Sequence, residues 1–428
     1  MLVAIGSIAI TFAISHSQTL NYPKTRKTDH VDVYHGVRVP DPYRWLEDDK
    51  SEETARWVEA ENKVTHDYLA RIPERAALRK RLEELYNYAK YSAPTRRGEY
   101  YFFSKNDGLQ NQSVLYKQKG LSGPPELLLD PNRLSADGTS KLVVAALSND
   151  GRRLVYTVSA GGSDWQEAHV IEVATLKTLD DRVQWIKASG LAWPGDSFFY
   201  SRYPAPADGH DLSAKNENHQ VYFHRVGTPQ SADELIYSDL ANPQRFHQVE
   251  TTQDGRFALL SISERGKGAD GNALYYRDLS KPDKKFLPIV TSITNDHYNL
   301  IDDVEGGFLL ETTHSAPNSK VVRFNTADSS WTEIVPEKPE PLSEAVTAGG
   351  RLFVAYLKDV ATRAYVHTLD GKPEREIVLP GVGTAGVVAG NHDDSDVFYT
   401  YASMNYPPAI FRYDIRTAKS SVFRSPDI

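Results

Sequence analysis

The 428-residue sequence contains no cysteine, no excess of basic residues and little uninterrupted apolar sequence. Without cysteine the chain has no disulfide, no thiolate metal site and no cysteine nucleophile. Lys and Arg number 49 against 57 Asp and Glu, and the net charge of −8 argues against nucleic acid as a partner, because phosphate binding needs a basic face. Beyond the N-terminus no segment approaches the roughly 18 apolar residues of a membrane span, so we expect no membrane contact in the mature form.

What is present is an ordinary globular composition, with 40% hydrophobic and 11% aromatic residues. The length suggests two or three domains of about 150 residues, or one large architecture. The aromatic, turn-punctuated mixture favours β structure.

Residues 1–17 resemble a short secretory signal peptide. An apolar run from Leu2 to Ile14 is followed by the small residues Ser15 and Ser17 near a suitable cleavage position. This interpretation predicts a periplasmic or secreted protein. No Lys or Arg precedes the apolar run, so two alternatives stay open: a misassigned start codon or a buried apolar strand, either of which is compatible with a cytoplasmic protein.

Residues 18–90 carry two amphipathic helical patterns. Ser51 is placed to cap a helix on which Trp57, Val64 and Tyr68 recur at helical spacing. A second helix is predicted to open with Pro73 and to place three leucines on one face: Leu78, Leu82 and Leu85. Each helix therefore needs a surface against which to bury its apolar face.

From about residue 91 to the C-terminus the helical pattern gives way to a repeat. Seven segments combine a turn rich in Gly, Asp or Asn with a β-branched and aromatic run, and each is followed by two further short strand patterns. They begin at Ala93, Leu147, Leu191, Thr251, Ile301, Ala345 and Val387. This period predicts an all-β, seven-bladed β-propeller over 91–428, preceded by the helical segment. A β-sandwich would explain the density of strands but not seven copies of one strand order.

One string in the helical segment is distinctive. Residues 35–48 read HGVRVPDPYRWLED, in which Asp41 can cap a short helix that begins with Pro42. Residues 103–116 read FSKNDGLQNQSVLY, and 161–165 read GGSDW. These strings closely resemble the prolyl oligopeptidase family of serine peptidases, and the similarity extends over nearly the whole chain from Tyr22.

The resemblance implies a function. Family members cut short peptides after proline, and their propeller restricts access to an α/β-hydrolase domain on which the N-terminal helical segment packs. The expected partners are therefore that hydrolase domain and short proline-containing peptides, and no cofactor is expected. The sequence departs from the family in one respect, because no Gly-x-Ser-x-Gly nucleophile elbow occurs in the 428 residues. We therefore place no catalytic residue on this chain and expect it to be inactive alone.

Three propeller residues are candidates by their position in the matching motifs. Phe246 falls where the family has an apolar residue at the central cavity, and Arg265 lies in a following loop that can contact peptide. Asp164 resembles a carboxylate near the domain junction, where an arginine of the hydrolase domain could pair with it. Each has a structural alternative: inter-blade packing for Phe246, a solvated charge for Arg265 and a turn cap for Asp164. Ala188 stands where the family often has an aromatic residue.

The remaining chemistry is sparse. No metal-binding motif is recognisable, and paired carboxylates such as Glu52-Glu53 and Asp302-Asp303 are interpreted as solvated or capping. Two functions therefore stay open: a propeller portion of a serine peptidase, or a stand-alone, non-catalytic propeller that binds peptides or proteins. The apolar faces of the two helices favour the peptidase portion, because a chain that worked alone would have made them polar.

Overall fold

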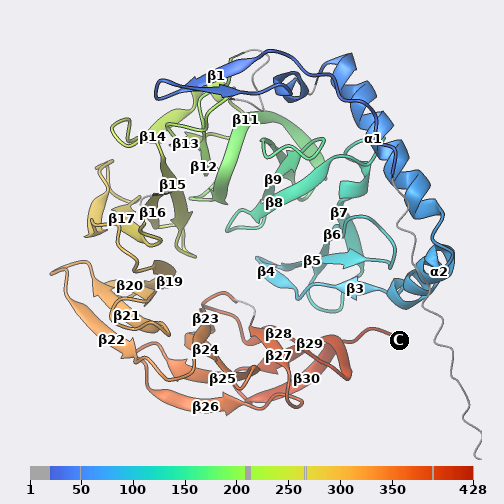
Figure 1. The fold of residues 1–428 in the computed structure, drawn as a ribbon. Helices are drawn as coiled ribbons and strands as arrows, with labels where there is room; N and C mark the ends of the chain where they lie inside the picture. Colours follow the sequence, from blue (N-terminus) through green and yellow to red (C-terminus); the bar gives the residue numbers. More distant parts are fainter. Residues whose placement is uncertain are drawn as a thin grey trace, which may run out of the picture. The chain divides into compact units, whose positions relative to one another are not determined.

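The structure is a computed structural model that describes residues 20–48, 50–207, 214–264, 266, 268–387 and 390–427. The chain divides into two compact units, 1–85 and 86–428 (Figure 1). The predicted signal peptide at 1–17 lies outside the described residues.

The first unit contains a β-hairpin and two α-helices. The hairpin consists of β1 (Val31–Tyr34) and β2 (Val37–Pro40), and a 3-10 turn (Arg44–Glu47) follows it; the helices are α1 (Glu52–Ala70) and α2 (Arg75–Tyr86). Local chemistry fixes the helix starts. Ser51 Oγ accepts a hydrogen bond from Thr54 N at 3.1 Å, as an N-cap should, and α2 begins two residues after the predicted Pro73. Neither described helix is long and apolar enough to cross a bilayer.

The predicted apolar faces of these helices are only partly covered. Leu78, Leu82 and Leu85 of α2 are 60%, 54% and 50% exposed, and Tyr68 of α1 is 45% exposed. Trp57, by contrast, is half-buried and donates its indole N–H to Thr25 Oγ1 at 3.0 Å. The exposed leucines therefore form an apolar stripe along α2.

The second unit is built from antiparallel sheets that follow one another in chain order around a central space (Figure 1). The first sheet contains β3 (Lys90–Tyr91), β4 (Thr95–Arg97), β5 (Tyr100–Asn106), β6 (Val114–Lys119) and β7 (Pro125–Leu129). Four later sheets have four strands each: β15 (Arg245–Thr251), β16 (Phe257–Glu264), β17 (Asn272–Asp278) and β18 (Leu287–Val290); β19 (Tyr298–Val304), β20 (Gly307–Thr312), β21 (Lys320–Asn325) and β22 (Trp331–Val335); β23 (Leu342–Ala348), β24 (Arg351–Lys358), β25 (Ala361–Thr368) and β26 (Pro373–Ile377); β27 (Thr384–Val387), β28 (Asp396–Ser403), β29 (Tyr406–Asp414) and β30 (Lys419–Arg424).

Between the first of these sheets and the rest lies one continuous seven-stranded sheet. Its strands are β8 (Lys141–Leu147), β9 (Arg153–Ser159), β10 (Gln166–Glu172), β11 (Lys177–Ala192), β12 (Phe198–Arg202), β13 (Gln220–His224) and β14 (Glu234–Tyr237). The prediction of seven blades is therefore wrong: the described strands form five separate blades, and the two repeats that begin at Leu147 and Leu191 share this single sheet.

Strand β11 explains the difference. It is 16 residues long, pairs with β10 up to Ile186 and pairs with β12 from Ile186 onward. Positive φ angles at Trp185 (65°) and Ala188 (51°) bend the strand where it changes partner. Val155 and Val170 consequently share a core with Phe198 and Tyr200 of the same sheet. Repeat counting could not detect this continuity, because it depends on strand pairing rather than on turn residues.

Neighbouring sheets share apolar cores, and the last sheet meets the first. Leu259 and Phe308, for example, belong to one cluster that joins the sheets containing β16 and β20. Arg96, next to β5, pairs with Asp393 and Asp394, and Tyr101 packs edge-on against Phe398 with ring centroids 6.3 Å apart. These contacts join segments about 300 residues apart in the chain and close the arrangement into a ring.

Candidate functional site

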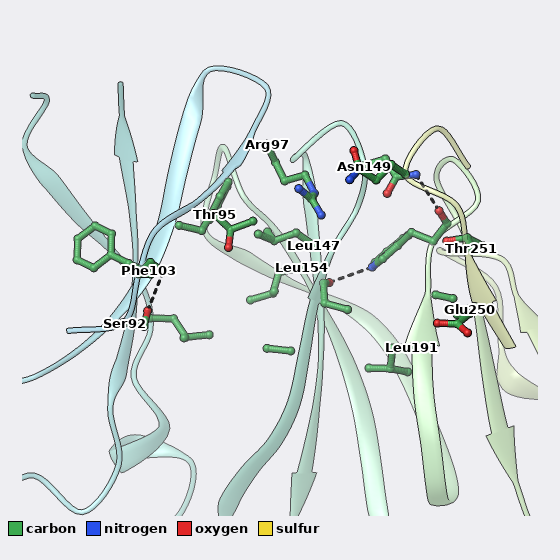
Figure 2. A pocket seen from close by; sticks show the side chains of 18 of the residues that line it. Ser92, Thr95, Arg97, Phe103, Leu147, Asn149, Leu154, Leu191, Glu250 and Thr251 are labelled. Carbon is green, nitrogen blue, oxygen red and sulfur yellow. Dashed lines mark hydrogen bonds between the residues drawn. The ribbon is translucent and has the colours of Figure 1, made fainter. Parts of the chain in front are cut away.

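A cavity of about 580 Å³ lies where the inner strands of the second unit converge. Strands β4, β8, β11, β15 and β19 contribute to it, and β5 and β6 extend one wall (Figure 2). Much of the lining is apolar: Phe102, Phe103, Leu115, Leu147, Leu154 and Leu191. The volume lies within the roughly 300–1,000 Å³ of typical small-ligand pockets, so the end of a short peptide would fit and a folded protein would not.

One end of the cavity is polar, and two of its side chains, Arg97 and Gln253, bond the turn at 390–394. Gln253 Nε2 donates to Gly390 O at 2.8 Å, and His392 N donates to Gln253 Oε1 at 3.1 Å. Arg97 Nη1 donates to Asn391 Oδ1 at 2.8 Å. Because Arg97 and Gln253 line the cavity, these bonds hold the turn next to its polar end; we call residues 390–394 the covering turn.

Asp302 anchors the covering turn from β19. Its side chain is 1% exposed, accepts a hydrogen bond from Thr347 Oγ1 at 2.6 Å and pairs with His392 Nε2. The interpretation of Asp302 as solvated or capping is therefore wrong. The neighbouring Asp303 is partly buried, and this burial, with the charges of Asp254 and Asp302, raises its pKa to about 6.

Glu250 is the second carboxylate of the cavity. It projects from β15 beside Leu191 (Figure 2). Water in the cavity reaches its side chain, but the surrounding sheets exclude most of the bulk solvent, and this desolvation raises the pKa of the Glu250 carboxyl to about 7. The site thus offers a wall of apolar and polar residues, a hydrogen-bonding end and one carboxyl whose pKa is about 7.

Comparison with known proteins identifies the family. A sequence model for the prolyl oligopeptidase N-terminal β-propeller domain matches residues 23–426. The chain belongs to the prolyl oligopeptidase family. The prolyl endopeptidase of Elizabethkingia meningoseptica is 40% identical over 431 residues, covering 100% of this chain and 60% of that protein. The dual function macrocyclase-peptidase POPB of Galerina marginata is 30% identical over 448 residues, covering 95% and 60%.

Solved structures agree. Prolyl oligopeptidase B from Galerina marginata, bound to a 35mer hydrolysis and macrocyclization substrate, superposes with a TM-score of 0.82 at 28% identity, over 95% of this chain and 61% of that chain. The family predicted from the sequence is confirmed. The chain matches the N-terminal β-propeller domain of this family and spans about 60% of the length of the curated relatives it matches.

Within this prolyl oligopeptidase family propeller, Phe246 lies in an aromatic cluster rather than in the wall of the 580 Å³ cavity. Its half-buried ring meets His219 edge-on at 5.8 Å, and His219 in turn lies 4.7 Å from the Tyr203 ring. The structure thus shows the packing contacts that the alternative interpretation expected, and contact of Phe246 with substrate stays a prediction.

The other two candidates are at the surface or outside the described residues. The Asp164 side chain is 81% exposed and lies 3.5 Å from Lys187 Nζ, so it has a cationic neighbour within the propeller and is also accessible to a partner. Arg265 lies outside the described residues. Ala188 is exposed, and its carbonyl accepts a hydrogen bond from Gln248 Nε2 at 3.0 Å. The roles of Asp164 and Arg265 stay predictions.

Sequence reasoning missed Glu250 and the covering turn. The strand alternation in β15 offered one signal, because His247, Val249 and Thr251 occupy one face and leave Glu250 on the other. No local signal links Gln253 to His392, which is 139 residues away in the chain.

Proposed function

We propose that this chain is the substrate-admitting portion of a serine peptidase that cleaves short peptides next to proline. The observation that carries the proposal is the cavity at the centre of a unit whose sequence matches the prolyl oligopeptidase propeller over 23–426. A relative has been solved with a 35mer substrate bound, which supports a peptide as the occupant. In this proposal the propeller filters peptides, and an α/β-hydrolase domain supplies the nucleophile, base and oxyanion hole.

The exposed stripe on α2 supports a partner domain over a stand-alone propeller. Three leucines at 50–60% exposure on one helix face are costly for a solitary soluble unit, because each leaves apolar surface in contact with water. A hydrolase domain that packed on α1 and α2 would remove that surface from water.

The first test is an activity assay of the purified 428-residue chain with a proline-containing reporter peptide. We expect no turnover, because the sequence has no Gly-x-Ser-x-Gly elbow, and an intact prolyl endopeptidase serves as positive control. Turnover blocked by a serine-directed inhibitor would overturn the assignment of catalysis to a separate domain.

A second test reads the DNA downstream of codon 428. A continuing frame with a nucleophile elbow supports the peptidase, and binding of proline peptides without any such frame supports the stand-alone propeller instead. We also propose export, based on residues 1–17. Cell fractionation and N-terminal sequencing test it, and a cytoplasmic protein that retains Leu2–Ile14 would contradict it.

A further inference from the structure

The lining of the central cavity contains four ionisable side chains, and three of them interact with neighbouring residues. Arg97 donates to Asn391 and to Arg96 O, Asp302 is held by Thr347 and His392, and Tyr116 stacks on Phe103 with ring centroids 5.8 Å apart. Glu250 is the fourth. Among the described residues no cation or hydrogen-bond donor pairs with its carboxyl, and burial is the sole cause of its raised pKa.

An uncompensated carboxylate in such surroundings is costly. Leu191 lies beside Glu250, and Leu147 and Leu154 line the same cavity (Figure 2), so an ionised Glu250 keeps only the water of the cavity and gains no counter-charge. Neither Arg97 nor any other described cation offsets this cost. Perturbed carboxyls of this kind in a cavity are typical of ligand-binding sites.

We propose that Glu250 binds a primary ammonium group of a peptide inside the central cavity, from either a lysine side chain or the peptide N-terminus. An ammonium supplies the charge and the N–H donors that the carboxylate lacks, and a charge-assisted hydrogen bond in a desolvated site is strong. Because the cavity of about 580 Å³ has the size of a small-ligand pocket, a chain end or a long side chain suits this position better than a threaded strand. The ligand class rests on the proposed function, which makes the occupant a peptide.

The test is calorimetric titration of the full 428-residue chain with four versions of one short proline-containing peptide. The peptides carry either lysine or norleucine at one position, and either a free or an acetylated N-terminus, so the two ammonium sources are separated. At pH 7.5, where the Glu250 carboxyl and a peptide α-amino group are both mostly charged, we expect the version with the recognised ammonium to bind about tenfold tighter than the peptide with neither ammonium. Glu250→Gln should abolish that difference and leave the affinity of the neutral peptide unchanged.

Two comparisons make the test specific. Glu59→Gln, a matched change on the exposed surface of α1, should retain the tenfold difference. In the unaltered chain the difference should shrink as the pH falls through about 7, because the protonated carboxyl no longer attracts an ammonium. This pH arm needs no variant, so it stays informative even if Glu250→Gln folds poorly.

The outcomes separate the two proposals. If neutral and ammonium-bearing peptides bind equally, or if Glu250→Gln keeps the difference, the role of Glu250 is overturned while peptide binding stands. If none of the four peptides binds, both the role of Glu250 and the proposed admission of peptides are overturned.

Discussion

His224 and Asp181 are joined by a buried hydrogen bond of 2.9 Å from Nε2 to Oδ1, across 43 residues of sequence. The other ring nitrogen, Nδ1, lies 2.8 Å from Asp233 Oδ1, and the three side chains are at most 1% exposed. An ionised carboxylate only accepts hydrogen bonds, so it favours a ring nitrogen that donates, and the bonds to Asp233 and Asp181 raise the pKa of His224. This bridge ties β11 and β13 to the segment that precedes β14.

Replacing His224 should strongly destabilise the propeller. His224→Gln leaves Asp181 and Asp233 buried without a counter-charge, and breaking a buried charge pair from one side costs about 3–5 kcal/mol. We expect a loss of that size in the free energy of unfolding, measured by urea denaturation. His314→Gln is the matched control, because His314 is 59% exposed in its pair with Asp296, and it should change stability little. An equally small effect of His224→Gln would contradict the bridge.

Two buried histidines of neighbouring segments should titrate in opposite directions. Burial alone would lower the pKa of His224, but hydrogen bonds and charges from Asp233 and Asp181 raise it. Burial lowers the pKa of His219 to about 4, and its Nδ1 accepts a hydrogen bond from His247 N. By ¹⁵N NMR at pH 7.5 we therefore expect imidazolium shifts for His224 and neutral shifts for His219.

The two shifts have opposite consequences for stability. His224 contributes stability that is fully present below the unfolded pKa of about 6.5 and is lost as the pH rises through its folded-state pKa. His219 destabilises the fold on acidification, because between about pH 4 and 6.5 the unfolded chain binds its proton and the folded chain does not. A neutral His224 at pH 7.5 would contradict the raised pKa of His224. A protonated His219 at pH 6 would contradict the lowered pKa of His219.

These residues also show what the sequence could and could not predict. Ser51 caps α1 as expected because a cap involves atoms three residues apart, and turn and strand patterns revealed the repeats for the same local reason. The continuity of β11 and the pairing of Asp302 with His392, 90 residues later, depend on how distant segments meet. The propeller class was therefore predictable, whereas the blade count and the cavity's polar end were not.

The covering turn gives a third prediction. Gln253→Ala removes both side-chain bonds that hold Gly390 and His392, each worth about 1 kcal/mol. We expect backbone amides at 390–394 to exchange with deuterium roughly tenfold to thirtyfold faster, with global stability changed less. Gln244→Ala is the control, since the Gln244 side chain donates a hydrogen bond to the carboxylate of Glu217 at 3.0 Å and is itself exposed. Unchanged exchange at His392 in Gln253→Ala would show that other contacts hold the turn.

The apolar stripe on α2 gives the last prediction. If the unit works beside a partner domain, the free 428-residue chain should self-associate through Leu78, Leu82 and Leu85, which remain half or more exposed. Leu78→Glu combined with Leu85→Glu should shift the chain to monomer in sedimentation velocity, and glutamate is a good helix former, so α2 should persist. The matched control is Leu109→Glu with Leu240→Glu, which adds the same charge at two other exposed leucines, 54% and 67% exposed. Equal loss of association in both variants would attribute the effect to charge. A monomeric unaltered chain would contradict the stripe as an interface. Association is expected because apolar area of this kind contributes about 25 cal/mol per Å² when it is buried.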